Sequence, residues 1–429
     1  MATSAAHKID RLPATGEGQR LAILATKACF LLMILSMMFE TLGAGSDSTP
    51  LYFTVSRGIG YVLVLFAMVC PGFSMRRVPG VLLCFAIYPM VLYAHYWTDP
   101  AWNQTAFLLS FGSAVQLVFF FWIAYNICAN GMVKLAMNTF AISAALAGWL
   151  WFSGAASGYW EGNLARATIL YEDPNNAGSM LALGFVAVLG AAMNATIQNK
   201  LIRLALFISI LPIGAALLAT GSRGAMLGAG IGIVVLLFAQ PSRSVMTSPV
   251  MRLAVLAVIF VVAIGSILSN SELVSRWNLT IEQHNLSGRQ TIYLSALRLV
   301  EERPLYGWGT VTLFDKLGMQ LGRSRVDTHN TELVVLGETG LLGFLPFAAG
   351  VLFCIREAWV HRRSLLGATP LALMGTLMVT ASSITWIQRK QFWLVLILAA
   401  TARFAYMIED KEEEPDHLQP LEAPASRPS

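Results

Sequence analysis

The feature that most constrains this chain is a succession of apolar runs of about 20 residues, separated by mostly short polar loops. An apolar helix of that length crosses the hydrocarbon core of a bilayer. Only 12% of the 429 residues are charged, about half the share found in soluble domains. The runs therefore predict an all-α polytopic membrane protein with about twelve transmembrane helices, centred near residues 31, 62, 89, 117, 145, 185, 212, 232, 261, 343, 375 and 400.

Basic residues in the short loops predict the orientation of these helices, because positively charged loops stay in the cytosol. One side carries ten of them: Arg76, Arg77, Lys134, Lys200, Arg203, Arg243, Arg252, Arg356, Arg362 and Arg363. The other side carries four: Arg166, Arg223, Arg389 and Lys390. Both termini are therefore predicted to be cytosolic. The net charge of +5 is modest and gives no reason to expect nucleic acid as a partner.

This orientation divides the chain into five parts. A cytosolic N-terminal segment (1–20) precedes transmembrane helices one to nine (21–269), which are followed by a large periplasmic loop (270–330). Helices ten to twelve (331–408) lead to a cytosolic tail (409–429). The tail is acidic and rich in proline, a composition that predicts disorder.

The periplasmic loop is too long for a bare connection, so it is predicted to be functional or disordered, and its residues favour order. Ser287 can cap a helix that begins at Gly288 and stops before Pro304. An apolar stripe at helical spacing lies within it: Tyr293, Ala296, Leu297 and Val300. We expect an amphipathic helix that lies on the bundle or in the membrane interface.

Three arginines are candidates for binding phosphate. Arg223 lies in the tight turn TGSRG, Arg289 lies in the first turn of the amphipathic helix on the face of Tyr293, and Arg166 precedes the sixth span. A guanidinium binds phosphate through two parallel hydrogen bonds, and a helix N-terminus adds backbone N–H groups. The alternative for each is an interfacial arginine that extends its charge to the lipid headgroups.

His329, in the sequence DTHNTE, is the candidate catalytic base. Asp327 or Thr328 can cap the tenth span, which would place His329 in its first turn and Glu332 on the same face. A helix N-terminus and nearby arginines disfavour the imidazolium, so the ring should be neutral and able to accept a proton. Asn330, Glu332 and Tyr293 are predicted to support it. The alternative is a hydrogen-bonded structural histidine.

The remaining polar residues of the outer loops have simpler interpretations. Asp173 and Pro174 are predicted as N-cap and first residue of the sixth span. Arg389 and Lys390 are expected to anchor helix ends at the headgroups. The sequence contains no ligand spacing for a metal and no nucleotide-binding fingerprint, so we expect neither a metal nor another cofactor.

Three motifs give the chain a family resemblance. TGSRG follows a span, SGR opens a helix that ends in RPLYGWG, and HNTELVVLGETGLLG enters the next span. In this order, and over about residues 160–350, the chain resembles bacterial O-antigen ligases and O-antigen polymerases. The resemblance implies an inner-membrane glycosyltransferase that needs no metal and takes its glycan from undecaprenyl diphosphate. In the ligases the acceptor is lipid A–core oligosaccharide, and the residues matching Arg223, Arg289 and His329 are the important ones.

The resemblance and the residues agree on a mechanism with inversion at the sugar. A diphosphate is a good leaving group, so it needs charge neutralisation, whereas an attacking hydroxyl needs a base. We expect His329 to be that base and Arg223, Arg289 and Arg166 to bind the diphosphate. Three alternatives stay open: an O-antigen polymerase, a protein O-oligosaccharyltransferase, and a transporter or flippase of lipid-linked glycans. The short C-terminal tail counts against a protein O-oligosaccharyltransferase, because those proteins have a further C-terminal domain.

Overall fold

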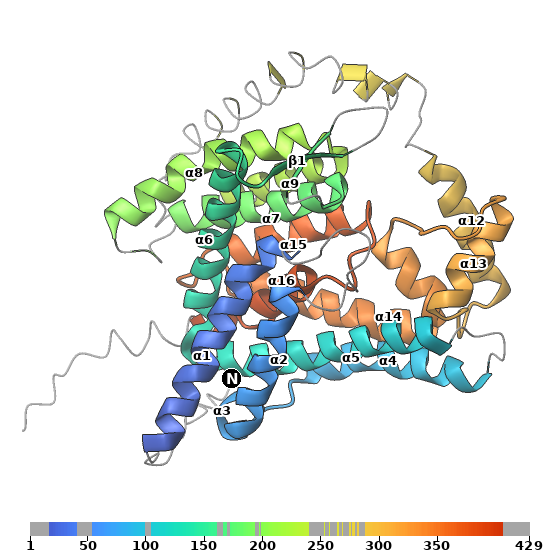
Figure 1. Cartoon of the computed structure of the whole chain (residues 1–429), viewed down its shortest axis with the longest axis horizontal. Coiled ribbons are helices and arrows are strands. Elements are labelled where there is room, and N and C mark those ends of the chain that lie inside the picture. Colours follow the sequence, from blue (N-terminus) through green and yellow to red (C-terminus); the bar gives the residue numbers. More distant parts are fainter. Residues whose placement is uncertain are drawn as a thin grey trace, which may run out of the picture.

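The computed structural model describes residues 17–40, 54–98, 104–160, 166–169, 172–193, 199–239 and 288–405, together with Ile197 and separate positions between 253 and 282. This part of the chain is almost entirely helical, as predicted (Figure 1). One departure is a short antiparallel hairpin, β1 (Ser157–Trp160) with β2 (Arg166–Ile169), in which Ser157 pairs with Ile169 and Trp160 with Arg166. The hairpin escaped prediction because each strand has just four residues.

The helices of the first half of the chain are α1 (Glu17–Ser36), the 3₁₀ turn η1 (Met37–Phe39), α2 (Val55–Val69), α3 (Pro71–Ser74), α4 (Gly80–Thr98), α5 (Gln104–Ile127), the π turn η2 (Cys128–Met132), α6 (Val133–Phe152) and α7 (Pro174–Met193). Those of the second half are α8 (Lys200–Ala219), α9 (Arg223–Ala239), α12 (Arg289–Glu302), α13 (Thr310–Gln320), α14 (Thr331–Val360), α15 (Thr369–Ala381) and α16 (Lys390–Ala400).

Within the described residues, five helical segments are long and apolar enough to cross a membrane: Glu17–Phe39, Phe111–Phe152, Pro174–Met193, Lys200–Ala219 and Thr331–Val360. Five shorter apolar helices accompany them: Val55–Val69, Gly80–His95, Arg223–Ala239, Thr369–Ala381 and Lys390–Ala400. Eleven of the twelve predicted spans fall on these segments, two of them on Phe111–Phe152. The ninth, near residue 261, lies outside the described residues apart from single positions, and the count of twelve stays a prediction.

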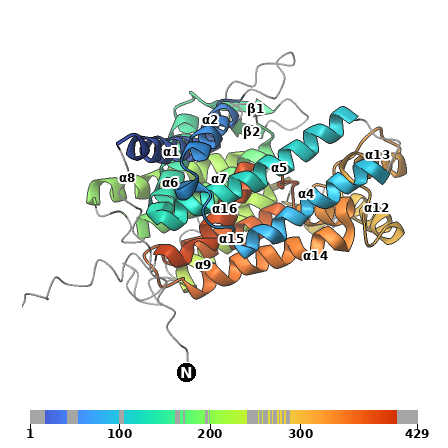
Figure 2. The same cartoon turned by 90° about the horizontal axis from the view of Figure 1, so that it is seen from below.

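The core of the bundle lies around α16, whose residues are all buried. Figures 1 and 2 both show this helix enclosed by its neighbours. Phe85 of α4 meets Phe121, Phe347 and Trp393 edge-on, with ring centroids 5.2–5.5 Å apart. Such edge-to-face contacts fix aromatic rings relative to one another. The helices that surround α16 are thereby held in a defined arrangement.

Helices α9 and α15 pack very closely because glycines of α9 face threonines of α15. A Cβ on Gly228 would lie 2.8 Å from the Thr380 methyl group and 3.1 Å from the Thr376 carbonyl oxygen. Small residues allow membrane helices to approach in this way. The contact fixes the start of α9, where Arg223 lies, against the end of α15.

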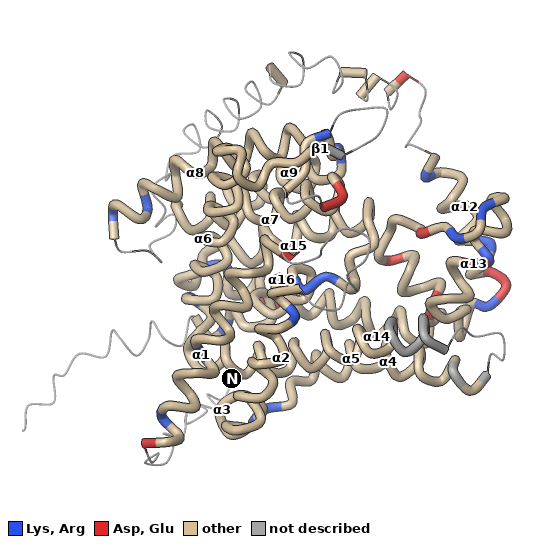
Figure 3. The backbone as a smooth tube through the Cα atoms, viewed as in Figure 1, with Lys and Arg blue, Asp and Glu red and all other residues tan. Residues whose placement is uncertain are grey.

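Helices α12 and α13 form a module that lies beside the first part of α14 at one end of the molecule (Figure 1). Figure 3 shows that charged residues gather on this module and at helix ends. Helix α12 was predicted to begin at Gly288, with Ser287 as its cap. It begins at Arg289, and Gly288 is its N-cap. Ser287 lies outside the described residues. Helix α13 was not predicted.

The buried face of α12 differs from the predicted stripe. Ala296 is buried as expected, but Leu297 is 42% exposed and Leu299 is buried in its place. The Trp308 indole N–H donates to the Leu299 carbonyl oxygen at 2.7 Å, so the following segment lies against this part of α12. The helix is therefore held by its own loop, and Leu297 is left outside that contact.

The position of this module relative to the membrane can be measured by cysteine labelling. Met319 of α13 is 77% exposed, so a cysteine there will be accessible. We expect Met319→Cys to react with an impermeant thiol reagent once the outer membrane is permeabilised, because the predicted orientation puts α13 in the periplasm. The parent protein, with its own five cysteines, is the control. Labelling that requires a broken inner membrane would contradict the orientation.

Candidate functional site

His329 lies one residue before the cap of α14, not in its first turn as predicted. Asn330 is the N-cap, and its side-chain oxygen accepts from the Leu333 backbone N–H at 2.8 Å. His329 has φ 49°, the one positive φ of a residue other than glycine in the described chain. Such a conformation costs about 1–3 kcal/mol in a non-glycine residue and persists where the surroundings impose it. The strain is concentrated at the residue predicted to be the base.

The surroundings that hold His329 come from the connection between α15 and α16. The His329 N–H donates to the Asp327 carboxylate at 3.0 Å, and the same carboxylate oxygen accepts from the Thr385 hydroxyl at 2.6 Å. Thr331 continues this attachment, since its hydroxyl donates to the Ile384 carbonyl and accepts from the Trp386 N–H. The His329 loop is therefore bound to residues 384–386 at several points.

The His329 imidazole is exposed and makes no hydrogen bond with another described residue. The prediction that Glu332 orients the ring is not met, because His329 leaves the helix face on which Glu332 lies. One carboxylate oxygen of Glu332 is instead buried without a hydrogen-bond partner among the described residues. The His329 ring is thus available to a ligand, while the His329 backbone is fixed.

Tyr293 joins α12 to this arrangement. Its hydroxyl lies 3.3 Å from the His329 carbonyl oxygen and 3.2 Å from that of Ser382, and Asn330 donates to the same Ser382 oxygen at 3.1 Å. Burial raises the pKa of the Tyr293 hydroxyl, and the Arg289 charge with hydrogen bonds from Asn330 and Arg289 offsets part of that rise. The predicted shared face of Arg289 and Tyr293 is therefore confirmed, and Tyr293 lies beside His329.

The first turn of α9 lies against the same connection. Arg223 is the first residue of that helix, and the preceding turn contains Gly221 with φ 62°. A Cβ on the next residue, Gly224, would lie 2.2 Å from the Ser383 hydroxyl oxygen. The backbone at the start of α9 therefore packs directly against Ser383, the neighbour of Ser382. Three elements that carry Arg223, Arg289 and His329 converge on the Ser382–Ser383 segment.

Arg166 supports this group from one step away. Its Nε donates to the Thr220 carbonyl oxygen at 2.7 Å, and its Nη2 donates to the Asn175 side chain at 3.0 Å. Thr220 belongs to the turn that leads into Arg223. Part of the Arg166 guanidinium therefore joins β2 to the start of α7 and to the turn before α9.

The Asp173–Pro174 prediction is confirmed, since α7 begins at Pro174 and the Asp173 carboxylate accepts from the backbone N–H groups of Asn175 and Asn176 at 2.9 and 3.2 Å. The residue before it, Glu172, was overlooked. It binds Arg389 through Nη2 at 2.7 Å and also accepts from the Asn176 amide at 3.0 Å.

Arg389 and Lys390 belong to a buried ion network, and the prediction that they anchor helix ends at the headgroups is wrong. Lys390 binds Glu40 at 2.7 Å, and Arg389 bridges Glu40 at 3.5 Å and Glu172 at 2.7 Å. Burial alone would raise the pKa of Glu40, but the charges of Lys390 and Arg389 outweigh it and hold that pKa below its usual value. The network ties the end of η1 and the start of α7 to the start of α16.

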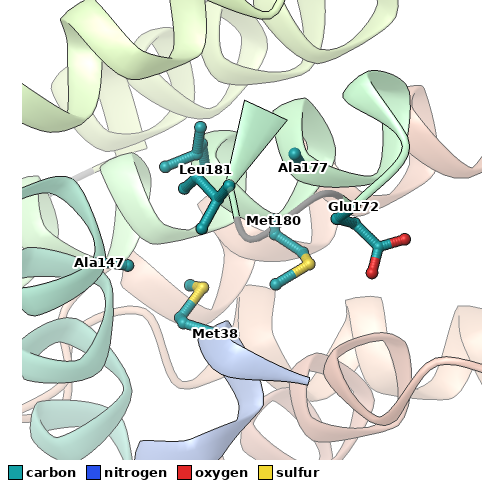
Figure 4. Close-up of a pocket in the computed structure, with 7 residues that line it drawn as sticks. Met38, Ala147, Glu172, Ala177, Met180 and Leu181 are labelled. Carbon is teal, nitrogen blue, oxygen red and sulfur yellow. The ribbon is translucent and has the colours of Figure 1, made fainter. Parts of the chain in front are cut away.

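A small, mostly apolar pocket lies behind this network, between η1, α6, β2 and α7 (Figure 4). Its lining residues are Met38, Ala147, Ile169, Glu172, Ala177, Met180 and Leu181. Figure 4 shows Glu172 at one end of the pocket, with its carboxylate directed away from Leu181 and Ala147. The carboxylate is therefore turned towards its cationic partners, and the pocket itself offers little to a polar ligand.

The two glycine-rich motifs RPLYGWG and GETGLLG form a backbone attachment. The N–H groups of Trp308 and Gly309 donate to the carbonyl oxygens of Gly337 and Glu338, both at 2.8 Å. The chain can approach this closely because α14 is interrupted at Gly340, which has φ 58°, and because Gly307 has no Cβ to meet the backbone of Glu338 2.6 Å away. The α12–α13 module is thereby joined to the break in α14.

Glu338 completes the attachment from within the bundle. Its side chain is 1% exposed and accepts a hydrogen bond from the Tyr88 hydroxyl of α4. The two residues are 250 positions apart in the chain, so no local sequence pattern indicates the pair.

Comparison with known proteins bears on the same part of the chain. A family profile described as O-antigen ligase matches residues 204–348. A protein of Pseudomonas aeruginosa named O-antigen ligase is 26% identical over 338 residues, which cover 77% of this chain and 77% of that protein. The profile match includes Arg223, Arg289, His329 and the break of α14 at Gly340. The family resemblance predicted from the sequence is confirmed.

Proposed function

We propose, from the match of an O-antigen ligase profile to residues 204–348, that the chain is a ligase acting at the periplasmic face of the inner membrane. In this proposal it transfers a glycan from undecaprenyl diphosphate to lipid A–core oligosaccharide, with inversion at the sugar and without a metal. The observation that carries it is the convergence, on the Ser382–Ser383 segment, of the three elements that contain Arg223, Arg289 and His329.

The arginines take the donor's diphosphate. Arg223 and Arg289 each begin a helix, so each combines a charged fork with a helix N-terminus, where anions are stabilised. Charge develops on the diphosphate as the bond to the sugar breaks, and fixed cations stabilise it there. Arg166 assists by holding the turn before Arg223 through the Thr220 carbonyl.

His329 takes the proton of the acceptor hydroxyl. Its imidazole is exposed, while its backbone is held by Asp327 and adjoins the Tyr293 hydroxyl. An exposed ring on a fixed backbone suits a general base, since proton removal requires a ring nitrogen within hydrogen-bond reach of the acceptor hydroxyl. The acceptor oxygen attacks the sugar as the diphosphate leaves on the opposite side. Asn330 and Tyr293 support the base by fixing the His329 loop to α12 and Ser382.

The deciding experiment follows the glycan. Purified protein is incubated with lipid-linked glycan donor and lipid A–core acceptor, and the products are separated by size. The ligase proposal expects glycan on lipid A–core. A polymerase would instead lengthen the lipid-linked chain, and a flippase would move the donor across a vesicle membrane without transfer. Either of these results, with no glycan on lipid A–core, would overturn the proposal.

The proposed binding of the diphosphate by Arg223 and Arg289 predicts that Arg289→Lys impairs glycan transfer, although the substitution keeps the positive charge. The planar fork is lost, so we expect transition-state stabilisation to fall by about 1–3 kcal/mol, measured as kcat/KM for the donor. Arg298→Lys is the matched control, because Arg298 lies on the same helix and is exposed. Equal defects in both variants would point to a general electrostatic effect of α12.

Metal independence is tested with chelator. Because arginines are proposed to neutralise the diphosphate, transfer should continue at an unchanged rate in excess EDTA. The control is the same reaction with added Mg²⁺ or Mn²⁺. A rate that falls with EDTA and returns with either ion would show that a metal, rather than the arginines, balances the leaving charge.

A further inference from the structure

Trp308 forms a fixed platform on the α12–α13 module. Its side chain is 94% buried, its indole N–H donates to the Leu299 carbonyl at 2.7 Å, and its backbone N–H donates to Gly337 of α14 at 2.8 Å. The ring is therefore fixed both to α12 and to the break in α14.

Two cations lie against this ring. The guanidinium carbon of Arg303 is 3.9 Å and the ammonium of Lys316 is 4.2 Å from the ring centroid, both within the range of cation–π attraction. The two charges are thus within about 8 Å of each other, where like charges repel. Arg303 is exposed and Lys316 is half-buried.

Neither cation is neutralised in the part of the chain that the structure describes. Glu301, Glu302 and Asp315 are neighbours in sequence, yet no ion pair joins them to Arg303 or Lys316 among the described residues. Two like charges held at one ring raise the local positive potential, which favours an anion beside them. Two exposed apolar side chains follow the two cations closely in the chain: Leu305 (62%) and Met319 (77%).

We propose that Arg303, Lys316 and Trp308 form a second phosphate-binding site, which takes a phosphate group of a lipid-linked glycan substrate. The Arg303 fork matches two phosphate oxygens and Lys316 adds a point charge, while Leu305 and Met319 provide apolar contact for a lipid. This site lies on different elements from Arg223 and the start of α12. It rests on the proposed function for the kind of substrate, which is either the donor diphosphate or a phosphate of the acceptor.

Binding without transfer tests the site. The full-length protein in detergent is titrated separately with undecaprenyl diphosphate, phosphorylated lipid A–core and enzymatically dephosphorylated lipid A–core, and affinity is measured by microscale thermophoresis. For the double variant Arg303→Gln/Lys316→Gln we expect about tenfold weaker binding of a phosphorylated ligand and unchanged binding of the dephosphorylated one. The control is Arg298→Gln/Arg323→Gln, which removes two exposed charges, one on α12 and one in the turn after α13.

Each outcome has a defined meaning. Weaker binding of lipid A–core alone assigns the site to the acceptor, and weaker binding of undecaprenyl diphosphate alone assigns it to the donor. Unchanged affinity for both, or an equal loss in the control, overturns the site. If the double variant fails to fold, the single variants Arg303→Gln and Lys316→Gln are compared in the same way. A protein that binds through this site yet transfers no glycan would overturn the ligase proposal and leave the site standing.

Discussion

Replacing His329 with asparagine is expected to abolish glycan transfer while donor binding is retained. Asparagine tolerates the left-handed backbone at φ 49° and keeps hydrogen-bonding capacity, so the loop should keep its shape. What it loses is the basic nitrogen, and general-base catalysis contributes about 10²–10⁴-fold to a rate. The measurement is kcat for transfer, together with the affinity for undecaprenyl diphosphate.

The control for this variant is His361→Asn. His361 follows the far end of α14, where it lies 3.7 Å from Glu357 and outside the proposed site. We expect that change to leave transfer near the parent rate. A folded His329→Asn protein that transfers glycan at a similar rate would remove the histidine from the mechanism and leave the arginines alone. Loss of donor affinity in the same variant would instead mean that His329 helps to bind the diphosphate.

Replacing Arg389 with methionine is expected to destabilise the whole bundle. The change leaves Glu172 without its cationic partner and Glu40 with Lys390 alone, and both glutamates are buried, with 8% and 9% of their surface exposed. Removing one partner of a buried ion pair costs about 3–5 kcal/mol, because the remaining charge is stranded in a poorly solvated place. The readout is the melting temperature of the detergent-solubilised protein.

Two further variants separate this effect from the loss of any positive charge. Arg323→Met removes an exposed arginine and should leave the melting temperature nearly unchanged. Adding Glu172→Gln to Arg389→Met removes the stranded charge, so part of the lost stability should return. If the double variant is no more stable than Arg389→Met, the ion network contributes nothing specific.

Acid should also lower the melting temperature. The pKa of Glu40 is depressed in the folded protein, so the stabilising charge of this carboxylate is lost as the pH falls through that pKa.

The sequence predicted those parts of the fold that depend on local pattern. Apolar runs marked the helices, and the pair Asp173–Pro174 marked the start of α7, because both signals lie within a few residues of their effect. The cap of α14 was misplaced by two or three residues. The segment DTHN offers three residues able to cap, and tertiary contacts of Asp327 and Thr331 with residues 384–386 select Asn330.

The centre of the candidate site was beyond local reasoning. Ser382 contributes to the candidate site through its backbone carbonyl oxygen. Every residue has such an oxygen, so the sequence gives no sign of this role. Arg389 was visible, but its partners Glu172 and Glu40 are 217 and 349 positions away in the chain. A single sequence does not reveal such pairings. The arginines and the histidine could be proposed as site residues because the sequence places these ionisable side chains near predicted helix starts.

The main-chain attachment of the α12–α13 module to α14 has a consequence for how such proteins can diverge. Hydrogen bonds between backbone groups do not depend on side-chain identity, so the attachment constrains mainly the positions where a Cβ would intrude, such as Gly307 and Gly340. Exposed residues of the module, Leu294 and Met319 among them, can be exchanged without detaching it. Substitutions can therefore accumulate on the exposed side of the module while its backbone attachment to α14 stays the same.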